Sequence, residues 1–536
     1  MISVSNAWKA AQNEILLPEM FVEITYEVTE PGLQDEAVAS GSNPESYADT
    51  AQVVSRVDKN SESYATLDYG CWGLDGSFNY FDGTPVDPGY VTVEYSESDG
   101  SMSQYPTITI DFAKRHDMAI PGMIITWGES HGGWAVDFRV RAYNATAMVA
   151  QTTVTGNTSI TSTVMLNMVG YSKITIEILK WSLPYQRPRC INVDLGLKTV
   201  YTKTDLLGYK HKQFVDLLSA KLPENEIEFK LRNDDNRWNP DNPHGAESYL
   251  LERQEIRVRY GMDDGKGIEW VNGGTFWISE WNTPMNGLEA DFTARDAIEF
   301  MNGTYTGIRS GSLYDIAVAA FTEANLTVLD DGSVRYRVDE SLKDIHTDFS
   351  SKDDEYAISE ILQMIANAGN CVFYQDRDGI VRIEPRDETY SGYMIEPKIS
   401  YSHPEYELNK PLRSVSVEYG EKQSESVEVS SRGEIQTIKN PLIMTKDDAA
   451  KVATATAELL KNRKVISGDF RADMRLDALD SIIVVSKYAS NVIAVTDVSY
   501  ETTGGAFKGK YEGRVVSINL ETSKAYSNEF ESGEIW

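Results

Sequence analysis

Two-residue alternation of apolar and polar side chains is the feature that most constrains this chain, because it recurs in short segments along most of its length. In 135–143, for example, Val136, Phe138 and Val140 would share one face of a strand, with charged residues on the other. Similar segments are 93–95, 107–112 and 173–179. Such strands between Gly-, Ser- and Asn-rich turns predict a mainly β fold with an α+β insert.

A Gly-x-Ser-x-Gly motif, formed by Gly128, Ser130 and Gly132, raises the alternative of a hydrolase. In α/β-hydrolases this serine lies on a sharp turn between a strand and a helix. Here the segment after the motif alternates like a strand, so we favour the glycine-rich turn of a β-hairpin, in which glycine supplies positive φ. We therefore predict no catalytic, cofactor-binding or metal-binding residues.

Composition excludes several classes of protein. The formal net charge of −32, with 50 basic against 82 acidic residues, argues against a protein that grips nucleic acid or anionic membranes. No stretch approaches the ~20 apolar residues of a membrane helix, and the N-terminus lacks the pattern of a secretory signal. Three widely spaced cysteines, Cys71, Cys190 and Cys371, predict buried free thiols in a reducing compartment.

The segment 20–197 has short strands at regular intervals and no long helix, which predicts a β-sandwich. In the order of its strands it resembles a galactose-binding-like jelly roll, the sandwich of many carbohydrate-binding modules. Four tryptophans are candidate sugar-stacking platforms, although packing in the core or in turns is the favoured interpretation for each. They are Trp72, Trp127, Trp134 and Trp181.

The segment 232–245 is rich in Asn and Asp and invites comparison with a calcium loop. Counted from Asp234, however, Trp238 occupies a ligand position and Gly245 stands where the closing glutamate belongs. Pro240 and Pro243 also stiffen the segment. We therefore favour Asx-turn chemistry over metal binding.

The strands around this loop resemble the baseplate hub, or tail-tip hub, proteins of tailed bacteriophages. The matching motifs are Asn-Asp-x4-Asn-Pro at 233–240, Gly-x-Phe-x-Ile-x-Glu-Trp at 274–281 and Phe-x-Ala-x-Asp-x-Ile at 292–298. Two helices follow, at 311–326 with Ser312 as N-cap and at 354–370 with Gly369 as C-cap, and the second precedes a strand, an Asp-Gly turn at 376–379 and another strand. A helix after Thr445 and the strands up to residue 520 complete the resemblance.

These observations predict six segments. They are an N-terminal helix or arm at 1–19, the sandwich at 20–197, a first hub β-barrel at 198–300, an α/β hub domain at 301–406, a second hub β-barrel at 407–520 and a C-terminal tail at 521–536. Within the first segment, we expect Ser5 to cap a short helix that carries Trp8 and the apolar pair at 15–16. The chain ends soon after the last barrel, so we expect no appended peptidoglycan hydrolase.

The resemblance implies a structural virion protein of the phage tail tip or baseplate, assembled in the bacterial cytoplasm and not inserted in a membrane. It implies a homotrimer whose paired barrels form a pseudo-sixfold ring at the end of the tail tube. Implied partners are distal tail or tail-tube proteins, the tape measure protein, and tail fibre or receptor-binding proteins. A host surface glycan is a candidate ligand, and genomic DNA would pass through without specific binding. The alternative is a carbohydrate-binding protein or a glycan-degrading enzyme.

Overall fold

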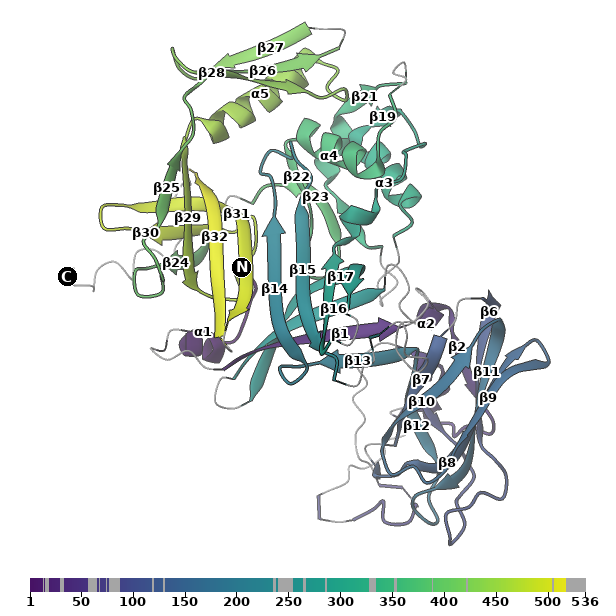
Figure 1. Ribbon diagram of the computed structural model, residues 1–536. Coiled ribbons are helices and arrows are strands. Elements are labelled where there is room, and N and C mark those ends of the chain that lie inside the picture. The colour runs from purple at the N-terminus through teal and green to yellow at the C-terminus, as the bar shows by residue number, and fades with distance from the viewer. Residues whose placement is uncertain are drawn as a thin grey trace.

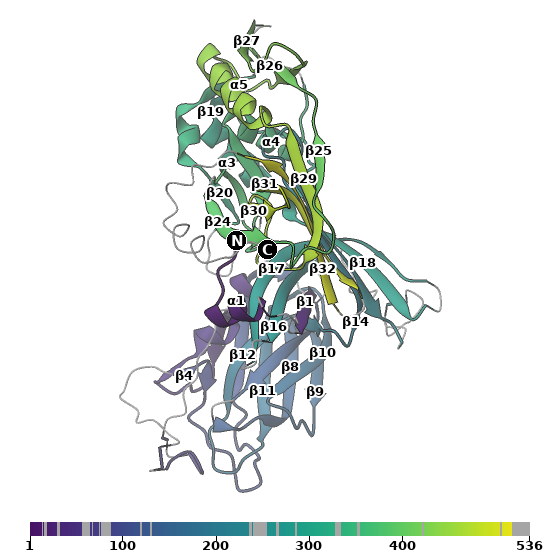
Figure 2. The same ribbon diagram turned by 90° about the vertical axis from the view of Figure 1, so that its left-hand side faces the viewer.

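The structure is a computed structural model that describes residues 1–516, except for these short segments: 13, 15–18, 29–32, 56–64, 67, 74, 77–86, 118–119, 129–130, 235–237, 240–253, 264–266, 285–286, 327–333, 351–353, 388, 421–422 and 504–505. Its described elements confirm the predicted mainly β chain, and Figures 1 and 2 show a sandwich at one end, a large curved sheet in the middle and an α/β region at the other end. The expected tail at 521–536 and the pair at 15–16 lie outside the described residues.

One continuous sheet forms the centre of the molecule. We call its two halves the first and second modules. The first module runs in the order β13 (Leu197–Tyr201), β1 (Met20–Val28), β16 (Glu255–Asp263), β17 (Ile268–Asn282), β18 (Glu289–Arg295), β15 (Glu224–Arg232) and β14 (Leu206–Phe214). The second continues with β31 (Ser490–Thr503), β32 (Ala506–Val515), β29 (Lys464–Arg471) and β25 (Glu405–Leu408), and β31 also pairs with β30 (Ser481–Val485), which pairs with β24 (Tyr390–Ile395).

The two modules meet where β14 pairs antiparallel with β31, from Lys210 opposite Glu501 to Phe214 opposite Asp497. They also share one hydrophobic core, which contains Phe229 and Tyr260 of the first module and Phe470 of the second. We predicted two related hub barrels, at 198–300 and 407–520, and the described ladders join the two modules edge to edge in one sheet. The join uses the backbone groups of both edge strands, which would otherwise face solvent.

The first module begins before the sandwich, because β1 pairs with β16 from Met20 opposite Met262 to Tyr26 opposite Ile256. On its other side β1 pairs with β13, with Val28 opposite Leu197. The sandwich is therefore inserted between two neighbouring strands of the central sheet, whereas the predicted boundary at residue 20 assigned β1 to the sandwich. The alternation in 20–28 identified the strand, but alternation does not reveal which distant strand becomes the partner.

The sandwich has two antiparallel sheets that pack face to face around their own core. Ile110, Phe138 and Ile176 of the larger sheet and Ile125 and Val193 of the smaller one are fully buried in that core. The larger sheet is β2 (Val38–Gly41), β6 (Thr107–His116), β11 (Tyr171–Trp181), β8 (Ala135–Asn144) and β9 (Ala147–Val154), and the smaller is β10 (Thr161–Met168), β7 (Ile120–Trp127), β12 (Arg189–Leu195) and β5 (Tyr90–Val91).

The hairpin predicted around the Gly-x-Ser-x-Gly motif is wrong, because β7 and β8 lie in different sheets of the sandwich. Trp127 of β7 faces Phe138 of β8 across the core, with ring centroids 5.1 Å apart. The connection crosses from one sheet to the other and is held at its base by a bridge between Gly128 and Gly133. The glycines still have a local reason: Gly132 has φ of +73°, and a Cβ on Gly133 would lie 2.5 Å from the Trp181 ring.

The α/β region confirms the predicted helices and their caps. Helix α3 (Leu313–Glu323) begins at Ser312, whose side chain accepts from the backbone N–H of Asp315 at 3.0 Å. Helix α4 (Ile358–Ala368) ends at Gly369 and leads into β22 (Cys371–Gln375) and β23 (Val381–Pro385), which pair antiparallel on either side of the predicted turn. The short strands β19 (Ser310–Ser312), β20 (Tyr336–Val338) and β21 (His346–Asp348) complete the region.

Residues 412–460 differ from the predicted second barrel. They form a small sheet of β26 (Leu412–Tyr419), β27 (Gln423–Glu428) and β28 (Glu434–Lys439). The sheet is covered by the helix predicted after Thr445, α5 (Lys446–Leu460), and Thr445 is its N-cap. Val415 and Val417 share a core with Ala453 of α5 and with α3 and α4. This unit therefore packs on the α/β region, at the top of Figure 1. Within the unit, the small alanines of α5 allow the helix to lie close to the strands.

Candidate functional site: the junction of the two modules

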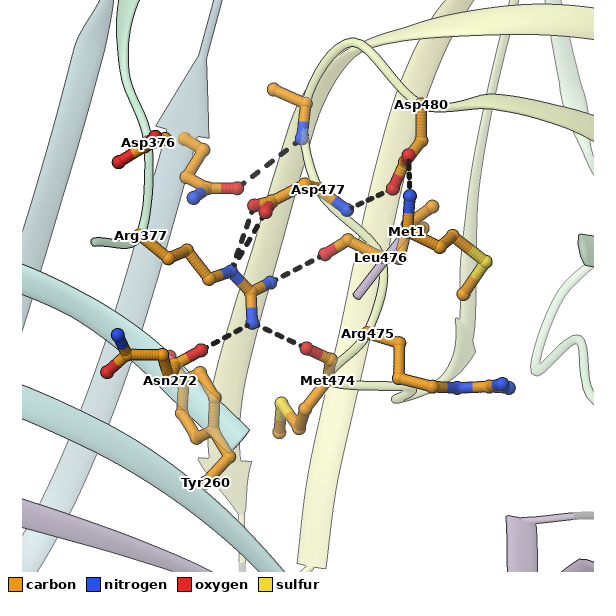
Figure 3. Close-up of polar contacts among 12 residues, drawn as sticks. Met1, Tyr260, Asn272, Asp376, Arg377, Met474, Arg475, Leu476, Asp477 and Asp480 are labelled. Atoms are coloured by element: carbon orange, nitrogen blue, oxygen red, sulfur yellow. Dashed lines mark hydrogen bonds and ion pairs between the residues drawn. The ribbon is translucent and has the colours of Figure 1, made fainter. Parts of the chain in front are cut away.

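The turn between β22 and β23 carries an arginine that enters the junction of the two modules. Asp376 fixes the turn, because its carboxylate accepts from the backbone N–H groups of Asp378 at 3.0 Å and Ile380 at 2.9 Å. Gly379 has φ of +77°, a conformation that glycine adopts at little cost. The turn thereby directs Arg377 away from the α/β region and between the two modules (Figure 3).

Arg377 connects three parts of the fold. Its Nη1 donates to the carbonyl of Asn272 on β17 at 3.1 Å and to that of Met474 at 2.6 Å, and its Nη2 donates to the carbonyl of Leu476 at 2.8 Å. Its Nε donates to the Asp477 carboxylate at 3.1 Å (Figure 3). Burial by itself would lower the pKa of Arg377, but the charge of Asp477 keeps that pKa above its usual value. The guanidinium is therefore a permanent buried cation.

A network of buried polar side chains extends from Arg377 along the junction. The Arg377 guanidinium lies 5.8 Å from the ring centroid of Tyr260, whose hydroxyl is 2.6 Å from that of Tyr209 and 2.7 Å from His211 Nδ1. Burial first, and then the charge of Arg377, lower the pKa of His211 to about 3, so the imidazole is neutral near pH 7. Tyr209 and His211 belong to β14, the strand that meets the second module.

Residues 473–480 of the second module are held against this junction. Tyr500 of β31 donates to the carbonyl of Leu476 at 2.7 Å. The backbone N–H of Asp477 donates to Asp480 at 2.7 Å, and the same carboxylate pairs with the amino group of Met1 (Figure 3). Burial raises the pKa of Asp480 to about 6, and the amino group of Met1 opposes that rise. The start of the chain is thereby bound to the second module.

A buried aspartate lies beside the same junction. Asp296 and Asp480 line one cavity of about 420 Å³. Asp296 Oδ1 accepts from the backbone N–H of Ile298 at 3.1 Å and so caps the short helix η4 (Ala297–Phe300). Burial raises the pKa of Asp296 to about 7, against the lowering effect of this hydrogen bond. Asp296 therefore titrates near neutral pH.

The solvent-facing side of the central sheet is covered by charged side chains in cross-strand pairs. Lys210 lies 2.7 Å from Glu228, and Lys230 lies 3.0 Å from Asp291. The face continues across the join, where Lys210 is opposite Glu501 of β31 and Asp497 is opposite Glu512 of β32. Carboxylates and cations are equal in number on the part of this face formed by β18, β15, β14, β31 and β32. The acids are Glu224, Glu226, Glu228, Glu289, Asp291, Asp497, Glu501 and Glu512, and the bases are Lys210, Lys212, Lys230, Arg232, Arg295, Lys508, Lys510 and Arg514.

The hydrolase motif does not have the context that catalysis requires. Ser130 lies outside the described residues. The motif is followed by strand β8 and not by a helix, and the adjoining His131 is buried. The structure thus brings no strand–turn–helix elbow to this position.

The Asn-rich loop is built around one buried asparagine. Asn233 accepts from the backbone N–H of Trp238 at 2.9 Å and donates to the carbonyl of Gly287 at 3.2 Å. Trp238 packs edge to face on Phe292, with ring centroids 4.9 Å apart. In this described part of the loop, Asx hydrogen bonding and core packing explain the composition, while residues 240–245 lie outside the described range. In the part of the chain that the structure describes, no group of three His, Cys, Asp or Glu residues is arranged to hold a metal ion.

The remaining candidate residues divide by burial. Trp127 and Trp181 are buried in the sandwich core, Trp134 is half-buried, and Trp72 is 66% exposed. Trp127 and Trp181 therefore cannot stack on a sugar. The three cysteines are buried free thiols, as predicted. Within the described residues, no helix is both long enough and apolar enough to cross a membrane.

Sequence reasoning missed the residues of the junction. Arg377 lies in the predicted turn at 376–379, but nothing in that turn shows that its side chain contacts residues about 100 positions away in both directions. An arginine at the tip of an Asp-x-Asp-Gly turn is an available signal. It becomes informative only when the partner carbonyls are known.

No protein-family model matches the chain, and no curated protein matches it. Its fold is similar to solved tail proteins. The 43 kDa tail protein of prophage MuSo2 from Shewanella oneidensis is 10% identical with a TM-score of 0.41, and the match covers 59% of this chain and 95% of that one. A tail protein from Neisseria meningitidis is 8% identical with a TM-score of 0.40, covering 60% and 94%. Prophage tail protein gp18 from Listeria monocytogenes is 10% identical with a TM-score of 0.36, covering 59% and 91%.

Replacing Arg377 by Met should lower the free energy of unfolding by about 3–5 kcal/mol, because the carbonyls of Asn272 and Met474 and the Asp477 carboxylate lose this donor. The carbonyl of Leu476 loses it too but keeps the hydroxyl of Tyr500. The Arg382→Met variant is the matched control, since its ion pair with Asp376 is partly exposed and should contribute less than about 1 kcal/mol. Denaturant unfolding measures both. A cost for Arg377→Met no larger than that of the control would contradict the role assigned to Arg377.

Replacing Asp296 by Asn should remove a pH dependence of stability. The pKa of Asp296 is raised on folding, so its contribution is greatest below the unfolded pKa of about 4 and is lost as pH rises through about 7. Relative to Asp296→Asn, the wild-type protein should therefore lose about 1–3 kcal/mol between pH 5 and pH 8. Asp480 is common to both proteins and cancels in this difference. Parallel stability curves for the two proteins would refute the assignment.

Proposed function

We propose that this chain is a structural protein of a bacteriophage tail, a baseplate or tail-tip hub that assembles with other tail proteins in the virion. The observation that carries the proposal is the β14–β31 join, which places two β modules side by side in one sheet with a shared core. The order of motifs in 233–298 and of the helices and strands after it supports the same assignment. At the junction, the described residues form a buried network of hydrogen bonds around Arg377. Such a network suits a structural protein better than an enzyme.

In the finer form of the proposal, three copies form a ring in which first and second modules alternate. Each copy supplies one module-to-module contact internally through β14 and β31. Three further contacts between copies would close a ring of six modules. Interfaces of obligate assemblies of this kind commonly bury more than ~2,000 Å².

The full chain should therefore form trimers or ring-shaped particles, because a module pair leaves edge strands that a neighbouring copy can contact. Light scattering coupled to gel filtration, with negative-stain images of the same fractions, measures this. A multiple of three supports the ring. A monomer throughout the micromolar range, without rings in the images, would overturn the ring.

The charged face of the central sheet is proposed to line the bore through which DNA passes. Its cations are matched by an equal number of carboxylates, so the face would have no net positive charge to hold phosphates, and the net charge of −32 on the whole chain would also keep DNA from adhering. The candidate tail partners remain the distal tail or tail-tube, tape measure, and fibre or receptor-binding proteins implied by the resemblance.

Reversing charge on this face should create DNA binding. The wild-type chain should not retain duplex DNA at ~0.15 M salt, whereas a Glu224→Lys, Glu228→Lys, Glu501→Lys variant should retain it with an affinity that falls steeply as salt rises. A gel-shift titration measures both proteins. Tight DNA retention by the wild-type chain would refute this role of the face.

A second candidate function, glycan contact by the sandwich, is favoured by a group of exposed aromatic side chains. Tyr69, Trp72 and Tyr185 are each more than half exposed, and the backbone N–H of Tyr69 donates to the carbonyl of Tyr185 at 3.1 Å. Tyr185 also has φ of +56°, a conformation that costs energy for a residue other than glycine. Flat rings held at the surface in this way suit stacking against sugar rings.

On a glycan array, the full chain should bind a subset of bacterial surface sugars, and Trp72→Ala should weaken that binding at least ~10-fold, equivalent to the loss of about 1.4 kcal/mol. Tyr105→Ala is the control, because Tyr105 is 55% exposed on the same sandwich but lies outside this group. An array without a positive spot, or equal losses in both variants, would end the glycan proposal and leave the tail proposal standing.

A further inference from the structure

One stretch of the sandwich is free of charge in a chain that is otherwise rich in it. Residues 142–172 contain no Asp, Glu, Lys, Arg or His, although a quarter of the whole chain is Asp, Glu, Lys or Arg. The stretch contains both β9 and β10. A soluble acidic protein normally distributes charge over such a length of exposed strand, so the gap points to a surface that has a specific use.

The structure places β9 and β10 at the same open side of the sandwich. β9 is the edge strand of the larger sheet and pairs with β8, and β10 is the edge strand of the smaller sheet and pairs with β7. At the opposite side, the short helix η1 (Thr50–Val54) buries Val53 and Val54 against the core, and Gln34 bonds to the carbonyls of Val54 and Val193. The β2 side of the sandwich is thus covered by other described segments, whereas along β9 the described residues place no strand besides β8.

The open side also leaves the core incompletely covered. Ala150 and Val154 of β9 and Leu166 of β10 pack on the sandwich core but are only partly buried. Met148 and Met165 are more than half exposed on the same two strands. A further strand laid along β9 would therefore cover apolar surface. It would also form backbone hydrogen bonds with the outer edge of β9, which pairs with no strand among the described residues.

This edge lacks the features that normally prevent pairing between sheets. Neither β9 nor β10 contains Lys, Pro or any charged residue, and the irregularities in their ladders lie toward one end of each strand. By contrast, the edge strand β25 of the central sheet carries the exposed Glu405 and Glu407. Charged edges of that kind repel incoming strands, and β9 does not.

We propose that β9 pairs antiparallel with β9 of a second copy of this chain, so that two five-stranded sheets join into one across a twofold axis. A second copy fits because two chains of net charge −32 approach each other with the least repulsion where both present an uncharged surface. The same edge on both copies satisfies this condition automatically, and its pairing is isologous. The proposal does not depend on the tail function, since it concerns a different surface.

Lysine on β9 should separate the two copies. A Val149→Lys, Gln151→Lys variant of the full chain places like charges on facing strands and should weaken association at least ~10-fold, so that the measured mass is halved where the wild-type chain is paired. Val38→Lys is the matched control, because Val38 is also an exposed valine on an edge strand of the same sheet, at the opposite side. Sedimentation equilibrium over a concentration series measures all three proteins.

The ratio of masses separates this proposal from the ring. A fall from six copies to three, or from two copies to one, supports β9 pairing whatever the ring does. Equal masses for the wild-type chain and the β9 variant at every concentration would overturn it. An equal effect of Val38→Lys would overturn it as well.

Cysteine cross-linking tests the register. Antiparallel pairing about a twofold axis brings one residue of β9 near its own copy, within the ~4.4–6.8 Å between Cα atoms that a disulfide spans. Single cysteines at Val149, Gln151 and Thr153 should give covalent dimers on mild oxidation, strongest at one position, whereas Val38→Cys should give none. The three native cysteines are buried and do not interfere. Dimers at none of the three positions, together with equal masses for the wild-type chain and the β9 variant, would exclude this pairing.

Discussion

A single buried guanidinium, that of Arg377, holds together the three parts of the fold that the central sheet brings near one another. Five donors in a planar fork can satisfy several carbonyls that no backbone ladder reaches, and Arg377 uses them on β17, on residues 474–476 and on Asp477. Backbone pairing between β14 and β31 joins the modules along one line. The arginine links the α/β region to both sides of that line, and the lowered pKa of His211 keeps its imidazole neutral near this cation.

Local features were predictable from the sequence because their causes lie within a few residues. Ser312 caps α3 because its side chain reaches an N–H three residues on, and the buried face of α4 follows from helical spacing alone. The Asp-Gly turn before β23 has the same local origin. The interpretation of Asn233 as turn chemistry also held, since its partners include the N–H of Trp238, five residues on.

What failed was the choice of distant partners. A two-residue period shows that 120–127 and 135–144 are strands with one buried face, but a hairpin and a crossing between two sheets produce the same pattern. The boundary at residue 20 failed for the same reason, because β1 finds its partner more than 200 residues later. Arg377 could not be singled out from the sequence, since its structural role depends on carbonyl groups that come together only in the folded sheet.

The insertion of the sandwich has a mechanical consequence. Its two connections leave from the same end of adjacent antiparallel strands, where Val28 lies opposite Leu197. A force that pulls the sandwich along these strands would act on β1 and β13 in the same direction. β1 could then separate from β16 only by sliding along the whole ladder, and not by breaking its hydrogen bonds one at a time. Shearing a ladder strains all its hydrogen bonds together. The two connections therefore hold the sandwich to the central sheet against a force applied along the strands.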